Sequence, residues 1–179
     1  MTENTDVLAE LAKARNALIR ATEGLSDEQA GRRTTVSELC LGGLIKHVST
    51  IEEQWLRFVV DGPSAMSYDL PEGVTWQDIF SGQAEPPQWM IDHRNDFQLL
   101  PGETLEGVLK RYEEVAARTT EIVTTVDMDA TQPLPAAPWH EPGGVRSARR
   151  VLMHVIAETS QHAGHADILR ESLDGQKSS

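Results

Sequence analysis

The sequence contains a single cysteine, Cys40, among its 179 residues. One cysteine excludes an internal disulfide framework and any zinc site built from several cysteines, and it is typical of a reducing compartment. No stretch approaches the roughly 20 apolar residues of a membrane span, and the N-terminus lacks the basic start and apolar segment of a signal peptide. These absences predict an unprocessed, soluble protein of the cytoplasm that has no membrane partner.

Basic residues are also scarce. The chain has 16 Lys and Arg against 28 Asp and Glu, which gives a net charge of −12. Binding to a phosphate backbone depends mainly on Lys and Arg, so we expect no nucleic-acid partner. The length suits one domain with its own core, which we predict over residues 1–175, followed by a frayed tail at 176–179. A metal ion in such a domain would serve chemistry rather than hold the fold together.

Helical periodicity dominates the chain, and neither strand alternation nor an internal repeat is visible. Four amphipathic segments are predicted to be helices, at about residues 5–24, 35–61, 104–123 and 147–175. Thr35 and Glu38 have the spacing of a capping box for the second helix, and Ser147 and Gly175 are typical bounds for the fourth. We therefore predict an all-α fold, a four-helix bundle.

A long, loop-rich connection joins the second and third predicted helices. Residues 61–102 hold many of the prolines and glycines, and only WMIDHRNDF, residues 89–97, favours a short helix there. Connections of this length usually carry function or cover a site. We therefore expect the connection to contribute to whatever site the helices form.

The last predicted helix contains an unusual cluster of histidines with a glutamate, in HVIAETSQHAGHADILRE. At about 100° per residue, His162 falls within the apolar stripe of this helix and Glu158 falls at its edge. His165 and His154 fall progressively outside the stripe on the same basis. A charged carboxylate near the core lowers the stability of the fold by several kcal/mol unless it is paired, protonated or bound to a metal ion. Glu158 and His162 are therefore the inward candidates for metal ligands.

A third ligand has to come from another helix. His47 lies between Leu44 and Val48 on the inner side of the second predicted helix, and Gly42 and Gly43 before it permit close approach of backbone or ligand. Two imidazoles and a carboxylate suit Zn²⁺, with Ni²⁺, Fe²⁺ and Mn²⁺ as alternatives, and three protein ligands leave coordination positions open. An open position is what catalysis requires.

Simpler interpretations stand beside the metal site. A lone histidine on an apolar face is more often a hydrogen-bonded core residue than a ligand, and Glu158 could instead pair with Arg170. His93 and His140 fall in predicted loops, where solvation is the simplest expectation. Cys40 is more simply a small apolar residue than a nucleophile. The four tryptophans are more simply core anchors than pocket walls, and the arginines at 149 and 150 more simply solvated than anion-binding.

Two segments together resemble a known family. They are GGLIKHVSTIEEQW, residues 42–55, and VLMHVIAETSQHAGHADILRESLDG, residues 151–175. In order and spacing they resemble the DinB-like superfamily, specifically its DUF664 branch. The resemblance implies a four-helix bundle in which His47, Glu158 and His162 hold a metal. Many relatives have histidine where this chain has Glu158, and the glutamate is similar to the arrangement in mycothiol-dependent maleylpyruvate isomerase.

Characterised members of this superfamily are thiol-dependent enzymes. The resemblance therefore implies a metal-dependent S-transferase or isomerase that uses a low-molecular-weight thiol such as mycothiol together with a small electrophile. Metal binding would make the thiol a better nucleophile, because a free thiol with a pKa of about 8.5 is mostly protonated at neutral pH. Two alternatives stay open, a non-catalytic metal-binding stress-response protein and a metal-dependent hydrolase. Relatives are often dimers, so a homodimer is a further expectation.

Overall fold

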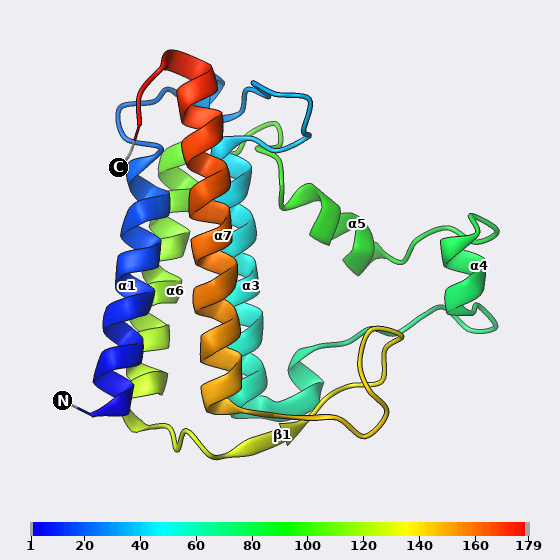
Figure 1. Ribbon diagram of the computed structural model, residues 1–179. Coiled ribbons are helices and arrows are strands. Elements are labelled where there is room, and N and C mark those ends of the chain that lie inside the picture. The colour runs from blue at the N-terminus through cyan, green and yellow to red at the C-terminus, as the bar shows by residue number, and fades with distance from the viewer. Residues whose placement is uncertain (1, 178–179) are drawn as a thin grey trace.

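The computed structural model describes residues 2–177, and its architecture is mainly helical. Four long helices account for most of it: α1 (Glu3–Arg20), α3 (Leu41–Asp61), α6 (Leu105–Thr125) and α7 (Ala148–Asp174). They lie side by side, with α7 against both α1 and α3, and α3 also against α6 (Figure 1). The all-α prediction is therefore confirmed for the main body of the molecule.

The shorter elements lie in the connections between the long helices. They are α2 (Asp27–Ala30), the 3-10 helix η1 (Gly62–Ala65), α4 (Trp76–Phe80), α5 (Gln88–Asn95), β1 (Thr131–Pro133) and β2 (Val145–Ser147). The two strands pair antiparallel, with Thr131 opposite Ser147. The expectation of no strand was wrong at this point, because three residues are too few to show an alternating pattern.

Helix α7 begins and ends with the predicted residues, Ser147 and Gly175, and α6 begins with a cap of the same kind. The side chain of Thr104 accepts a hydrogen bond from the backbone N–H of Gly107, and Ser147 accepts one from that of Arg150, so each satisfies a free donor of the first turn. Gly175 ends α7 with φ of 78°, a left-handed conformation that favours glycine. These caps define the helix that holds two of the predicted ligands.

The start of α3 differs from the prediction. The hydroxyl of Thr35 accepts a hydrogen bond from the N–H of Ser37 and caps no helix, while Glu38 is exposed. The helix begins six residues later, at Leu41, and Cys40 is its N-cap, with Sγ accepting from the N–H of Gly43 at 3.4 Å. The local Ser/Thr turn outcompetes the capping box. Cys40 therefore has a structural role that the sequence did not suggest.

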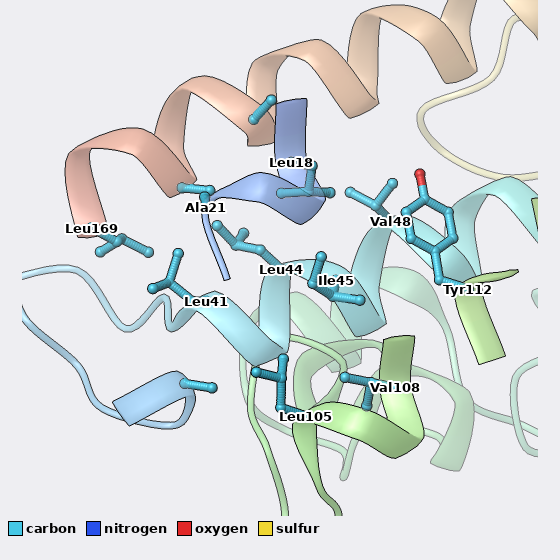
Figure 2. Close-up of a cluster of buried hydrophobic side chains, with 13 residues drawn as sticks. Leu18, Ala21, Leu41, Leu44, Ile45, Val48, Leu105, Val108, Tyr112 and Leu169 are labelled. Atoms are coloured by element: carbon cyan, nitrogen blue, oxygen red, sulfur yellow. The ribbon is translucent and has the colours of Figure 1, made fainter. Parts of the chain in front are cut away.

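The core is formed by apolar side chains from all four long helices. One cluster contains Leu18 of α1, Leu44 and Val48 of α3, Val108 of α6 and Leu169 of α7. Figure 2 shows these side chains pointing toward a common interior. Burial of each such side chain contributes roughly 1.5–3 kcal/mol. This packing holds α3 and α7 in register, and register between these two helices is what the predicted metal site needs.

The connection between α3 and α6 projects away from the long helices, and α4 lies at its far end (Figure 1). Its aromatic side chains form a cluster with the loop before β2: Tyr68 packs on Trp89 at 5.4 Å and on Trp139 at 5.1 Å between ring centroids, and Trp76 also packs on Trp139, at 5.0 Å. Three of the four tryptophans therefore join two connections and do not anchor the helical core.

Two further predictions concern the C-terminal tail and the absence of a membrane span. Within the predicted frayed tail, Gln176 accepts a hydrogen bond from Arg170 at 2.8 Å and Lys177 pairs with Glu171, while residues 178–179 lie outside the described part. Among residues 2–177, no helix is long and apolar enough to cross a membrane.

Candidate metal centre

His47 is held in the interior by the core packing of α3. Its neighbours Leu44 and Val48 are fully buried, and His47 itself is only 2% exposed. The Nε2 atom of the ring lies 3.4 Å from Oε1 of Glu158 on α7. His47 therefore points inward, as predicted, and its ring faces α7, the helix that carries the other two predicted ligands.

The residues from α7 approach the same point. His162 lies one turn after Glu158, and its Nε2 atom is 3.2 Å from the same Oε1 atom. One ligand atom from each of His47, Glu158 and His162 lies within 4.8 Å of the other two. Ligand atoms 2.0–2.1 Å from a tetrahedral Zn²⁺ are about 3.3 Å apart, so the two measured separations fit an ion of this kind. The three residues fit a metal in donor type and in spacing.

Electrostatics put these groups in the protonation states that metal binding needs. Hydrogen bonds from His162 and then from His47 hold the pKa of Glu158 well below its ordinary value, so its carboxylate is ionised. Burial lowers the pKa of His47, which keeps its imidazole neutral at neutral pH. An ionised carboxylate and a neutral imidazole are the forms in which these side chains bind a metal ion.

Phe97, from the segment between α5 and α6, covers the ring of His47. The two rings stack with centroids 3.9 Å apart and planes 24° from parallel. The segment is attached to α3: Cys40 donates a hydrogen bond from Sγ to the carbonyl of Phe97 at 3.6 Å, and Nζ of Lys46 donates to the carbonyl of Asn95 at 3.3 Å. Lys46 also pairs with Glu103 at 2.8 Å. These attachments fix one wall of the site.

Gly43 makes that attachment possible. A Cβ atom at this position would overlap with the backbone carbonyl group of Phe97. The predicted close approach at the glycines is therefore confirmed: the backbone of Phe97 approaches Gly43, and the side chain of Leu99 approaches Gly42.

Replacement of Gly43 with alanine is expected to displace Phe97 from His47 and to destabilise the protein by about 1–3 kcal/mol, the usual cost of overpacking. Urea denaturation measures the change. Gly164→Ala is the matched control, because its Cβ would meet nothing within 4 Å and alanine favours a helix interior. Equal stability of the Gly43→Ala variant and the wild type would show that the contact is not tight.

Sequence reasoning missed His93 and Asp96. His93 is exposed, as predicted, but it lies in α5, the short helix predicted at residues 89–97, and not in a loop, and its ring centroid is 5.5 Å from that of His47. Ligand atoms of His47, His93 and Asp96 also lie within 4.8 Å of one another, although His93 is exposed. Burial raises the pKa of Asp96. The His-x-x-Asp spacing on one face of the predicted short helix was the signal that could have identified them.

The other histidines lie at the edge of the site or away from it. His154 and His165 are exposed, as the helical wheel predicted. His154 packs against Trp55 at 5.1 Å between ring centroids, and Nδ1 of His165 lies 3.3 Å from Nδ1 of His162. His140 is half-buried and donates through Nδ1 to the carbonyl of Pro135 at 2.9 Å, so its predicted solvation was wrong.

Two arginines considered above have partners elsewhere. Arg170 pairs with Asp174 at 3.0 Å, so it is not the counter-ion of Glu158. Arg149 pairs with Glu3 and Asp129, so it is neither simply solvated nor free to bind an anion. The alternative in which Glu158 is neutralised by Arg170 is therefore wrong, and the two histidines are the groups that contact its carboxylate.

Two cavities help to locate a substrate. A groove of about 1190 Å³ runs between α1 and α6, but its lining includes none of the three predicted ligands. A smaller cavity of about 270 Å³ lies between α3 and α5, and its lining includes His93 and Asp96, the C-cap of α5. Size alone favours the groove, whereas chemistry favours the smaller cavity, because it is lined by His93, whose ring centroid lies 5.5 Å from that of His47.

Comparison with known proteins identifies a family for this chain. The family model described as mycothiol-S-transferase matches residues 6–175, which is nearly the whole chain. No curated protein matches the sequence. The matched segment includes both helices that carry the candidate ligands, together with the connection that covers them. The chain therefore belongs to the mycothiol S-transferase family, within the DinB-like superfamily.

Proposed function

We propose that this protein is a metal-dependent mycothiol S-transferase whose ion is held by His47, Glu158 and His162. The observation that carries the proposal is the convergence of both Nε2 atoms on one carboxylate oxygen, at 3.4 and 3.2 Å. Membership of the family supports a small-molecule thiol as substrate. Zn²⁺ suits this donor set best, and Ni²⁺, Fe²⁺ and Mn²⁺ are alternatives.

The proposed reaction is a thiol substitution. The thiol S–H bond breaks, an S–C bond forms to the electrophile, the bond to the leaving group breaks with its electron pair, and the thiol proton passes to solvent. A divalent ion at this site would supply the positive charge that lowers the pKa of the thiol. Isomerisation of a small electrophile by reversible thiol addition is the related alternative.

The residues of the chain have distinct parts in this proposal. Glu158 provides negative charge in a form that stays ionised, because the histidines lower its pKa. Phe97 holds the ring of His47 by stacking and keeps water from that face. The side chains of His162 and Glu158 are 12% and 23% exposed, so small molecules can approach from the α7 side. Access of this kind favours catalysis over a sealed, non-catalytic metal site.

A metal-dependent hydrolase is the second candidate, because a specific observation supports it. Hydrolysis needs a base that is not a metal ligand, and His93 and Asp96 lie beside His47. Product formation from a test electrophile in the absence of any thiol would favour hydrolysis. Product formation that depends on mycothiol would favour the transferase.

We also propose that residues 1–175 form one DinB-like domain and that α1, α3, α6 and α7 are its four-helix bundle. The family match over residues 6–175 supports the domain. The packing of α7 on α1 and α3, and of α3 on α6, supports the bundle.

Metal removal tests the proposal directly. Protein purified without a metal-affinity step should contain about one divalent ion per chain. An ion present at about 100 times its Kd stabilises the folded state by about 2.7 kcal/mol, so a chelator should lower Tm by about 5–10 °C and abolish conjugation of mycothiol to a test electrophile. Added Zn²⁺ should restore both. Metal-free protein that conjugates mycothiol at the full rate would contradict the proposal.

A further inference from the structure

The cavity between α3 and α5 is built from two matching helix faces. Helix α3 contributes four side chains at spacings of three, four and seven residues, and three from α5 together with its C-cap Asp96 follow the same spacings, while Ala65 of η1 completes the lining. The side chains of the two faces are Thr50, Glu53, Gln54, Arg57, Trp89, Asp92, His93 and Asp96. Residues so spaced share one face of a helix. Two faces therefore oppose each other across about 270 Å³ of space.

Apart from Trp89 and Ala65, the side chains that line the cavity are polar, which is unusual where helices adjoin. Helices normally meet through apolar side chains, yet α5 has no buried residue. Gln54 and Arg57 have no side-chain hydrogen-bond partner among residues 2–177. Glu53, by contrast, is neutralised by Arg111 at 3.0 Å. A space lined in this way suits a polar molecule that can use the free amide and guanidinium groups.

The cavity adjoins the candidate metal centre. His93 lines the cavity, and its ring centroid lies 5.5 Å from that of His47. Asp96 also lines it, and one of its oxygens lies within 4.8 Å of ligand atoms of both histidines. A molecule that places one end at the metal centre can therefore extend its other end between α3 and α5.

We propose that this cavity binds the hydroxyl-rich sugar portion of the thiol co-substrate. The proposal rests on the proposed function, because mycothiol joins its cysteine to an amino sugar and an inositol. Trp89 offers an indole face for a sugar ring, and its Nε1–H is already held by the carbonyl of Asp69 at 3.2 Å. Carboxylates accept hydrogen bonds from hydroxyls, and Gln54 and Arg57 donate them.

The charge of the lining supports a neutral ligand over an anionic one. With Glu53 paired to Arg111, the carboxyl groups of Asp92 and Asp96 remain against Arg57, which is the one guanidinium in the lining. A phosphate or carboxylate ligand would be repelled by this excess of negative charge. Sugar hydroxyls carry no charge and can use both kinds of group. Most of the favourable contacts would therefore be hydrogen bonds and stacking.

The test uses Gln54→Ala and Arg57→Ala, alone and combined, in the metal-loaded protein. The probe is glucosaminyl-inositol, the sugar portion without the thiol, and its binding is followed by tryptophan fluorescence and calorimetry. The double variant should bind the probe about tenfold more weakly, since two hydrogen bonds are lost. KM for mycothiol should rise by a similar factor, while activity with N-acetylcysteine and metal content stay unchanged. Arg94→Ala, also exposed on α5 but outside the cavity lining, is the matched control.

The outcomes separate the two proposals. Probe binding that is absent in the wild type, or equal in the wild type and the double variant, overturns the sugar site whatever the enzyme does. Probe binding that depends on Arg57, without any conjugation of mycothiol, supports the sugar site and overturns the proposed transferase. An equal loss in the Arg94→Ala control would show only a general charge effect and would also overturn the site.

Discussion

Replacement of His162 with alanine is expected to empty the metal centre and abolish mycothiol conjugation. The variant would leave two candidate ligands, and Glu158 would lose its hydrogen bond at 3.2 Å. Loss of a residue that merely orients a metal ligand costs about 10–100-fold in metal affinity or activity, so loss of a ligand itself should cost more than about 100-fold. Elemental analysis and a conjugation assay measure the two effects. Only partial destabilisation is expected, because His162 is half-buried.

His154→Ala is the matched control for this experiment. His154 is on the same helix, one turn before Glu158, but it is exposed and packs on Trp55. Metal content and activity should therefore stay close to those of the wild type. Glu158→Gln adds a graded test, because it keeps the shape of the side chain but removes its charge, and it should weaken metal binding. A His162→Ala variant with full metal content and full activity would refute both the site and the mechanism built on it.

Replacement of Glu52 with alanine should have the largest effect on stability. Glu52 is fully buried in α3, and it accepts hydrogen bonds from Arg15 of α1, including one from Nε at 3.0 Å, and from Thr119 of α6. The ion pair joins α1 to α3, and the hydrogen bond from Thr119 adds α6, so Glu52 links three of the long helices. Removal of the carboxylate leaves the buried guanidinium of Arg15 without a counter-ion, which costs about 3–5 kcal/mol. Urea denaturation followed by circular dichroism measures the loss.

The adjacent Glu53 is an unusually close control for Glu52. It is half-buried, and its partners Arg111 and Arg118 are exposed. Exposed ion pairs contribute about 0–1 kcal/mol, so Glu53→Ala should change stability little. Similar losses in the two variants would show that burial does not distinguish the two ion pairs. Combined replacement of Arg15 and Glu52 by apolar residues should recover part of the stability, because no unpaired charge is left.

Much of the helical architecture could be predicted because its signals are local. The capping side chains of Thr104 and Ser147 and the terminal Gly175 act within a few residues of the helix ends that they define. The start of α3 was misplaced because Thr35 had two local options, a capping box and a Ser/Thr turn, and both read alike in sequence. The two short strands gave no pattern at all, because pairing between Thr131 and Ser147 links residues far apart in the chain.

The candidate site likewise has a part that the sequence determined and a part that only the tertiary structure decided. By itself the sequence determined that Glu158 and His162 share an inward helix face and that His47 lies on the inner side of its own helix, because helical periodicity records which face is buried. Only the tertiary structure placed the three beside one another. Only the structure also brought His93 and Phe97 against His47. The position of a side chain in a long connection depends on packing between distant segments, such as that of Gly43 against the backbone of Phe97. No local sequence pattern encodes that contact.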